Sequence, residues 1–172
     1  MFSNSSKYPA IFTLPLLALI GYLFFCYVSI PQYFSLLDNV NLLIHEMGHF
    51  FFMNFRNEFL TVLGGTIMEL LIPSLILIYF WRSLDYFGIT LCLAWIGTNF
   101  FYIATYSGDA VKQQLPLLFG GAIHDWYYIF SKLGVLQYTD QISFVFWCIG
   151  VLFFILSLGF GTLLVINRWR GL

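Results

Sequence analysis

The chain has 172 residues, a net charge of −1, 60% hydrophobic residues and only 9% charged residues. Soluble domains carry roughly 25% charged residues, and a soluble fold of this size could not bury so much apolar surface. We therefore expect one integral membrane domain. The sequence contains no basic patch, which argues against a nucleic-acid partner. Each of the three cysteines stands alone in an apolar segment, which argues against a disulfide framework.

Apolar segments of membrane-spanning length follow one another along the chain. They predict an all-α, polytopic membrane protein with about six transmembrane helices, because polar breaks, glycines or prolines separate the segments. The first segment is too long for a signal peptide, so we interpret it as a retained anchor helix. The predicted spans cover residues 9–30, 35–55, 61–81, 87–106, 115–136 and 142–166.

The topology depends on the segment 115–136, which carries His124-Asp125 at its centre. If this segment crosses the membrane, both termini lie on the same side, together with Arg56. The tendency of Lys and Arg to stay on the inner face then predicts cytoplasmic termini in a multi-pass plasma-membrane protein. The alternative is a helix lying flat at the interface, which the aromatic residues 126–128 would suit. We expect the crossing arrangement.

The segment 35–55 contains the sequence His45-Glu46-Met47-Gly48-His49 near its centre. Histidines four residues apart lie on one face of a helix, close enough to bind one metal ion. Glu46 lies about 100° around the helix from His45, where it could act as the base for a zinc-bound water. Ionisable groups at membrane depth are costly and are by default functional. The alternative is a buried polar pair that bridges helices.

A zinc hydrolase needs a third protein ligand, and three residues are candidates. We rank Asp125 first and His124 second, because they would share the depth of the histidine pair if 115–136 crosses the membrane. Glu69 ranks third. It precedes Pro73 by four residues, and the proline ring would open the helix at that position.

Other polar residues and glycines have two interpretations each. Asn99 could hydrogen-bond a substrate or a developing oxyanion, or it could join helices. Gly64 and Gly65 could form a loop that offers backbone groups to a peptide, or a close helix contact. For Asp38 we expect a helix cap, whereas Asn41 could equally orient a ligand imidazole.

The chain resembles the site-2 protease family of intramembrane zinc metalloproteases, as a divergent and minimal member. The resemblance rests on residues 45–49 within an apolar segment, on Gly64-Gly65 soon after it, and on an aspartate in a later span. It implies that one zinc ion is bound by His45, His49 and Asp125, with Glu46 as the catalytic base. It also implies cleavage of membrane proteins within or near their transmembrane segments, in the lipid bilayer. The alternatives are a membrane protein that binds or transports metal without hydrolysis, and a catalytically inactive adaptor.

Overall fold

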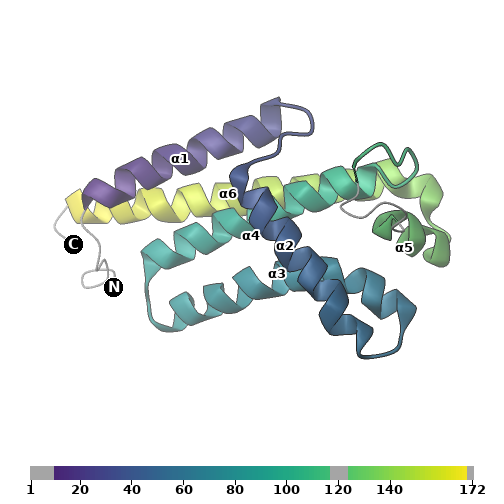
Figure 1. The fold of residues 1–172 in the computed structure, drawn as a ribbon. Coiled ribbons are helices and arrows are strands. Elements are labelled where there is room, and N and C mark those ends of the chain that lie inside the picture. Colours follow the sequence, from purple (N-terminus) through teal and green to yellow (C-terminus); the bar gives the residue numbers. More distant parts are fainter. Residues whose placement is uncertain (1–9, 117–123, 170–172) are drawn as a thin grey trace.

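The structure is a computed structural model that describes residues 10–116 and 124–169, with side chains described for 13–116 and 124–167. The described residues form helices and no strands, which confirms the expected all-α class. Figure 1 shows the arrangement of the helices. Their bounds are α1 Ala10–Ser29, α2 Leu36–Met53, α3 Glu58–Arg82, α4 Tyr86–Gly108, α5 Asp125–Leu133 and α6 Thr139–Trp169, with a 3-10 turn η1 at Leu136–Tyr138 before α6.

Three described helical segments are long and apolar enough to cross a membrane, and they are compatible with the predicted membrane protein. They are Glu58–Arg82, Tyr86–Gly108 and Leu136–Asn167. The 25 residues of α3 extend about 37 Å, at about 1.5 Å per residue, and the hydrocarbon core of a bilayer is about 30 Å thick. The apolar part of α1, Thr13–Ser29, is shorter, and α2 is interrupted by polar residues. Six passes, a plasma membrane and cytoplasmic termini stay predictions.

The fifth predicted span, 115–136, is not one continuous helix. Leu115 and Pro116 are not helical, and residues 117–123 lie outside the described part of the chain. The helix α5 has nine residues, about 13 Å in length, which is too short to cross a bilayer. Its ends have local causes: the His124 side chain accepts a hydrogen bond from the Tyr127 N–H, and Gly134 adopts a left-handed conformation with φ 69°. The described residues of 115–136 therefore do not form the single spanning helix that we expected.

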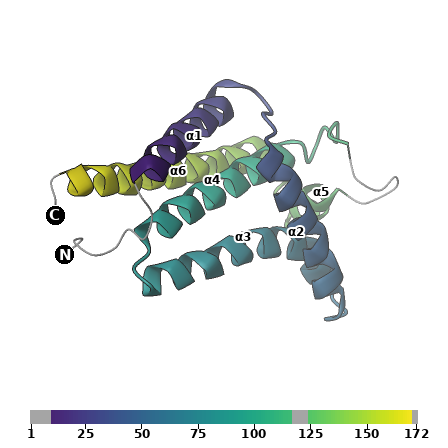
Figure 2. The ribbon, with the colours of Figure 1, turned by 60° about the vertical axis from the view of Figure 1, so that its left-hand side comes forward.

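The helix α4 is the central element of the fold. It packs against α3 and α6, while α1 lies along α6. Figures 1 and 2 show α2 running across α3 and α4 rather than along them. One hydrophobic cluster, centred on the fully buried Phe154, joins α1, α4 and α6; its other buried members are Ile20, Tyr27, Ala94 and Phe101.

The crossing of α2 and α3 depends on glycines. A Cβ atom added to Gly48 would overlap the carbonyl group of Gly64 and would lie 2.9 Å from the Cα atom of Gly65. The backbones can therefore approach this closely only with hydrogen in the place of a side chain. This close approach brings the histidine-bearing face of α2 against α3. Of the two interpretations of Gly64 and Gly65, the structure favours the helix contact, because both residues lie inside α3 rather than in a loop.

Candidate metal centre

His45, His49 and Asp125 come together between α2 and α5. One donor atom from each residue lies within 4.8 Å of the other two. The Oδ2 atom of Asp125 is 2.8 Å from Nε2 of His45 and 3.2 Å from Nε2 of His49. Donor atoms around one tetrahedral zinc ion are roughly 3.4 Å apart. The three residues could therefore hold a metal ion, and among the ranked candidates the structure places Asp125 with the histidine pair.

The second ring nitrogen of each histidine faces an oxygen. Nδ1 of His49 is 2.8 Å from the Thr61 carbonyl oxygen in the first turn of α3, and Nδ1 of His45 is 3.4 Å from Oε2 of Glu69. A neutral imidazole that donates from Nδ1 keeps a lone pair on Nε2, which is the arrangement found in metal-binding histidines. Both Nε2 atoms accordingly face Asp125 and the space where a metal ion would bind.

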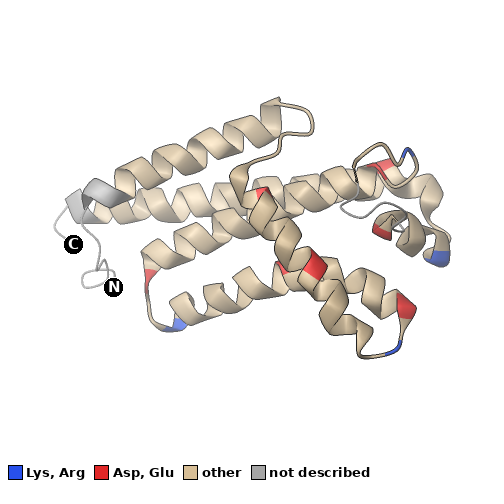
Figure 3. Ribbon diagram, viewed as in Figure 1, with Lys and Arg blue, Asp and Glu red and all other residues tan. Residues whose placement is uncertain are grey.

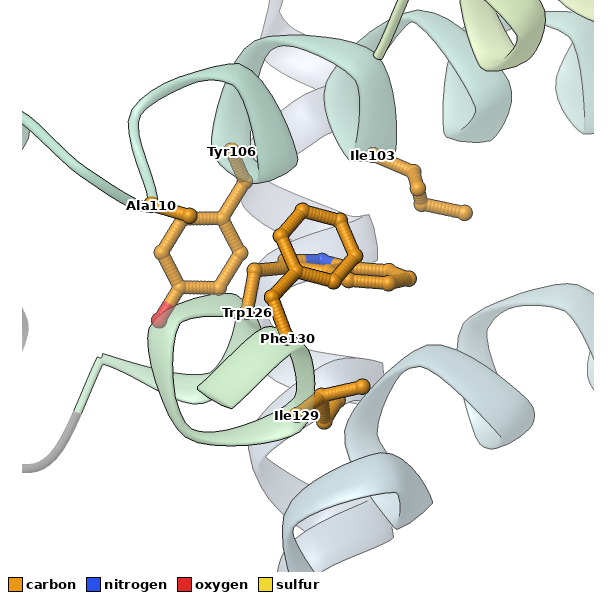
Figure 4. Packing of buried hydrophobic residues seen from close by; sticks show 6 residues of the cluster. All are labelled: Ile103, Tyr106, Ala110, Trp126, Ile129 and Phe130. Carbon is orange, nitrogen blue, oxygen red and sulfur yellow. The ribbon is translucent and has the colours of Figure 1, made fainter. Parts of the chain in front are cut away.

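The carboxylate of Asp125 is placed by the packing of α5 against α3 and α4. Trp126, Ile129 and Phe130 of α5 belong to one buried cluster with Ile103 and Tyr106 of α4, drawn in Figure 4. The Asp125 N–H also donates to the Tyr106 hydroxyl group, at 3.3 Å. Burial alone would raise the pKa of Asp125, but without a metal ion the Nε2–H groups of His45 and His49 donate to this carboxylate, and these hydrogen bonds outweigh burial and lower its pKa. A bound metal ion would take the place of these two protons. The carboxylate therefore stays ionised and available to a cation.

The charges around the site favour a cation. Figure 3 shows Lys and Arg at loops and helix ends, whereas acidic residues also occur where α2 crosses α3. Within the described residues, every ion pair formed by a carboxylate has a histidine as its partner. Glu69 and Asp125 are both buried. Because buried carboxylates need a compensating charge, a divalent cation would balance the two.

His124 is not part of this group, contrary to its ranking as second candidate. Its Nδ1 atom accepts the Tyr127 N–H at 3.3 Å, and its Nε2 atom lies 3.5 Å from Oδ2 of Asp109. Its ring packs on the Tyr106 ring, with centroids 4.4 Å apart. The physical reason is its place at the N-cap of α5, from which its side chain folds back over the helix end, while Asp125 begins the helix and points toward α2.

Glu69 also lies outside the group of His45, His49 and Asp125. It approaches Nδ1 of His45, whereas Asp125 approaches Nε2. The two nitrogens of an imidazole point away from each other, so one ion bound at Nε2 is out of reach of Glu69. The carboxylate group of Glu69 lies behind the His45 ring and not beside the cluster.

Asn99 has an internal partner. Its Nδ2 group on α4 donates to the backbone carbonyl of Glu69 on α3, and its side chain is fully buried. Of the two interpretations of Asn99, the structure favours a bond between helices over contact with a substrate. Pro73 does not open α3, which continues through it, but proline has no N–H to donate to the Glu69 carbonyl four residues earlier.

Asp38 and Asn41 lie closer to the start of α2 and have separate partners. Oδ2 of Asp38 accepts the backbone N–H of Ser35 at 2.6 Å and the Tyr27 hydroxyl at 2.6 Å. Oδ1 of Asn41 accepts the Trp95 indole N–H at 2.7 Å. Asp38 thus caps the helix as expected, and Asn41 joins α2 to α4 instead of orienting a histidine.

A cleft of about 560 Å³ opens beside His45, which is the one member of the candidate metal group in its lining. Glu46 is half-buried in its wall, and no hydrogen bond or ion pair joins Glu46 to a described residue. Sequence reasoning missed two tyrosines of this wall, Tyr102 and Tyr106; their four-residue spacing was the available signal, hidden in a chain that is 22% aromatic. The lining consists of Gln32, Tyr33, Phe34, Leu42, His45, Glu46, Tyr102, Thr105, Tyr106, Leu115 and Pro116.

The fold and the site together define an all-helical protein that has helices of membrane-spanning length and a His-His-Asp group able to hold a metal ion. No protein-family model, curated protein or solved structure matches this chain. The resemblance to the site-2 proteases therefore depends on the residues themselves.

Proposed function

We propose that this chain is an intramembrane zinc metalloprotease of the site-2 protease type. One observation carries the proposal. The donor atoms of His45, His49 and Asp125 lie within 4.8 Å of one another, and Glu46 lines an adjacent cleft together with His45. Residues suited to hold the metal ion, a residue suited to act as base and space for a substrate are thus neighbours.

The chemistry of the donors favours zinc. Two imidazoles and one carboxylate form a three-ligand set that zinc hydrolases use, with a fourth position left for water or substrate. Calcium and magnesium prefer six or more oxygen ligands, and this group supplies one carboxylate. When bound, zinc would act as a Lewis acid and make water acidic enough to be a nucleophile near neutral pH.

Glu46 is suited to the role of general base. It follows His45 directly, so the turn of the helix directs its side chain away from the ligand position and toward the cleft. It has no hydrogen-bond partner among the described residues that would occupy its carboxylate. It would accept a proton from the attacking water and donate that proton to the amine released when the C–N bond breaks.

The cleft favours an apolar, extended peptide as substrate. Its walls combine leucines, Pro116 and aromatic side chains with the few polar groups beside the histidines. A transmembrane helix of another protein hides its peptide bonds in intrahelical hydrogen bonds. Such a substrate would have to unwind locally before a peptide bond could reach Glu46. We therefore propose the transmembrane or adjacent segments of membrane proteins as substrates.

The test uses the purified 172-residue protein in liposomes. These also contain a panel of single-span membrane proteins that carry an epitope at each end. The wild type should cleave a member of the panel. The Glu46→Gln variant should keep one zinc ion per chain and lose about 10²- to 10⁴-fold in cleavage rate. Glu58→Gln, the same chemical change at an exposed position, should cleave like the wild type.

Two outcomes would overturn the proposal. Full cleavage by the Glu46→Gln protein would remove Glu46 from the base role. Zinc flux into liposomes that is insensitive to Glu46→Gln, with no member of the panel cut, would instead support a metal-transporting protein.

A further inference from the structure

The carboxylate of Glu69 is the most deeply buried acidic group beside the metal-binding residues. The residue is 1% exposed, and neither of its two carboxylate oxygen atoms forms a hydrogen bond within the described part of the chain. Its nearest ion-pair partner is Nδ1 of His45, at 3.4 Å. That nitrogen is itself buried without another hydrogen-bond partner. An isolated buried carboxylate strongly destabilises a protein, so its retention here calls for a specific role.

The geometry separates this role from metal ligation. Asp125 and the Nε2 atom of His49 lie on the Nε2 side of the His45 ring, and Glu69 lies on the Nδ1 side. A metal ion bound to Nε2 requires that the ring proton be on Nδ1. Among the described residues, the Glu69 carboxylate is the acceptor that this Nδ1–H faces.

The backbone at Glu69 is held by a hydrogen bond from another helix, because α3 lacks one of its own hydrogen bonds there. Pro73 has no N–H, so the carbonyl of Glu69 lacks the donor that the fourth following residue supplies in a regular helix. The Asn99 amide group of α4 takes the place of that donor. The hydrogen bond that α3 lacks at this point is thus replaced by one that anchors Glu69 to the central helix.

We propose that Glu69 is a positioning residue of the metal centre, which accepts the Nδ1–H of His45 and thereby directs the Nε2 lone pair of His45 at the metal ion. Its charge completes the balance of the site. Two neutral imidazoles, the two carboxylates of Asp125 and Glu69 and one divalent cation sum to zero, which suits a site of low dielectric constant. The proposal rests on the metal centre of the proposed function, but not on proteolysis.

The test measures zinc affinity in detergent by competition with a chromophoric chelator, for the wild type and for variants at Glu69. Loss of a carboxylate that supports a metal-binding histidine reduces metal affinity by about 10- to 100-fold. We expect that reduction for Glu69→Leu. We expect a smaller one for Glu69→Gln, whose amide oxygen still accepts the Nδ1–H but carries no charge. Both variants should still bind one zinc ion per chain at saturation.

Two controls make the result specific. Thr66→Val changes another buried polar residue of α3 and should leave the zinc affinity unchanged. The visible absorption spectrum of bound Co²⁺ should be preserved in Glu69→Gln, because its three ligands are the same, and should be altered in Asp125→Ala. If the Glu69→Leu protein does not fold by circular dichroism, the nearly isosteric Glu69→Gln variant decides the test.

Wild-type zinc affinity in both Glu69 variants would overturn the positioning role. Loss of the saturating zinc ion or an altered Co²⁺ spectrum in a folded Glu69→Gln protein would show that Glu69 is a ligand. A wild-type protein that binds no zinc would contradict the proposed function itself. A wild type that binds zinc but cuts no substrate leaves this inference standing.

Discussion

Gly65 on α3 lies directly against the His45 ring on α2. A Cβ atom at Gly65 would be 2.5 Å from Nε2 of His45 and 2.6 Å from two ring carbons. Atoms cannot approach so closely, so the absence of a side chain at position 65 creates the space that the imidazole fills. The glycine therefore determines where a candidate metal-ligating atom lies, although it carries no side chain of its own.

A Gly65→Ala substitution should weaken zinc binding, because the added methyl group must displace the His45 ring or separate α2 from α3. Overpacking of this kind costs about 1–3 kcal/mol, and 1.4 kcal/mol corresponds to about a tenfold change in affinity. Chelator competition would measure the affinity. Gly159→Ala on α6 is the matched control, since nothing lies within 4 Å of its added Cβ atom. Equal zinc affinity in the two variants would contradict the expected contact.

The sequence predicted the helices well, because length and hydrophobicity govern them. The predicted segment 35–55 became Leu36–Met53, and 87–106 became Tyr86–Gly108. The histidine spacing also placed His45 and His49 on one face, because the period of the helix fixes this relationship without tertiary contacts. Local periodicity and composition were sufficient for these features.

The segment around Asp125 could not be predicted in the same way. An apolar stretch such as 115–136 looks the same whether it crosses a bilayer or packs as a short helix on another helix. Two capping residues, His124 at the N-terminus and Gly134 at the C-terminus, make α5 short. The cluster that Trp126 forms with residues of α4 then holds this short helix in place. Similarly, the spacing to Pro73 indicated that Glu69 belongs to a polar region. It did not reveal which nitrogen of His45 the carboxylate faces, because that depends on the crossing of α2 and α3.

Asp125→Asn should greatly reduce zinc binding, since it removes the negative charge of the proposed third ligand. His124→Asn should retain one zinc ion per chain, because asparagine also serves as an N-cap and His124 contacts neither metal-binding histidine. Metal analysis after gel filtration would compare the two proteins. A His124→Asn protein that lost its zinc, with the Asp125→Asn protein retaining it, would reverse the assignment of the third ligand.

Removal of the metal should destabilise the protein. Without a cation, only the histidines can offset the negative charges of the buried carboxylates of Asp125 and Glu69. A ligand present at one hundred times its dissociation constant stabilises the folded state by about 2.7 kcal/mol. Thermal unfolding in detergent, followed by circular dichroism, should therefore occur at lower temperature after chelation and recover when zinc is added back. The His45→Ala protein should unfold at the same temperature with and without zinc. A wild type insensitive to chelation would contradict a structural contribution of the metal.

Asn99 and Pro73 should be energetically coupled through the Glu69 carbonyl. Asn99→Leu leaves that carbonyl buried without a donor, which costs about 1–3 kcal/mol. Pro73→Ala restores a backbone N–H that can donate to the same carbonyl within α3. Asn99→Leu should therefore reduce the free energy of unfolding less in the Pro73→Ala background than in the wild-type background. A double-mutant cycle built on thermal unfolding would measure the coupling, which reaches about 0.5–3 kcal/mol for residues that share a partner.

The same double-mutant cycle can be measured with zinc affinity in place of stability. This measurement tests whether the hydrogen bond from Asn99 to the Glu69 carbonyl supports the metal centre. If Asn99 holds Glu69 in place behind His45, Asn99→Leu should weaken zinc binding, and Pro73→Ala should partly restore it. Thr90→Val, at another buried position of α4 whose hydroxyl group bonds within its own helix, should not affect zinc affinity. Strictly additive effects of Asn99→Leu and Pro73→Ala on both stability and affinity would show that the two residues act independently, and that the bond from Asn99 to the Glu69 carbonyl does not position Glu69.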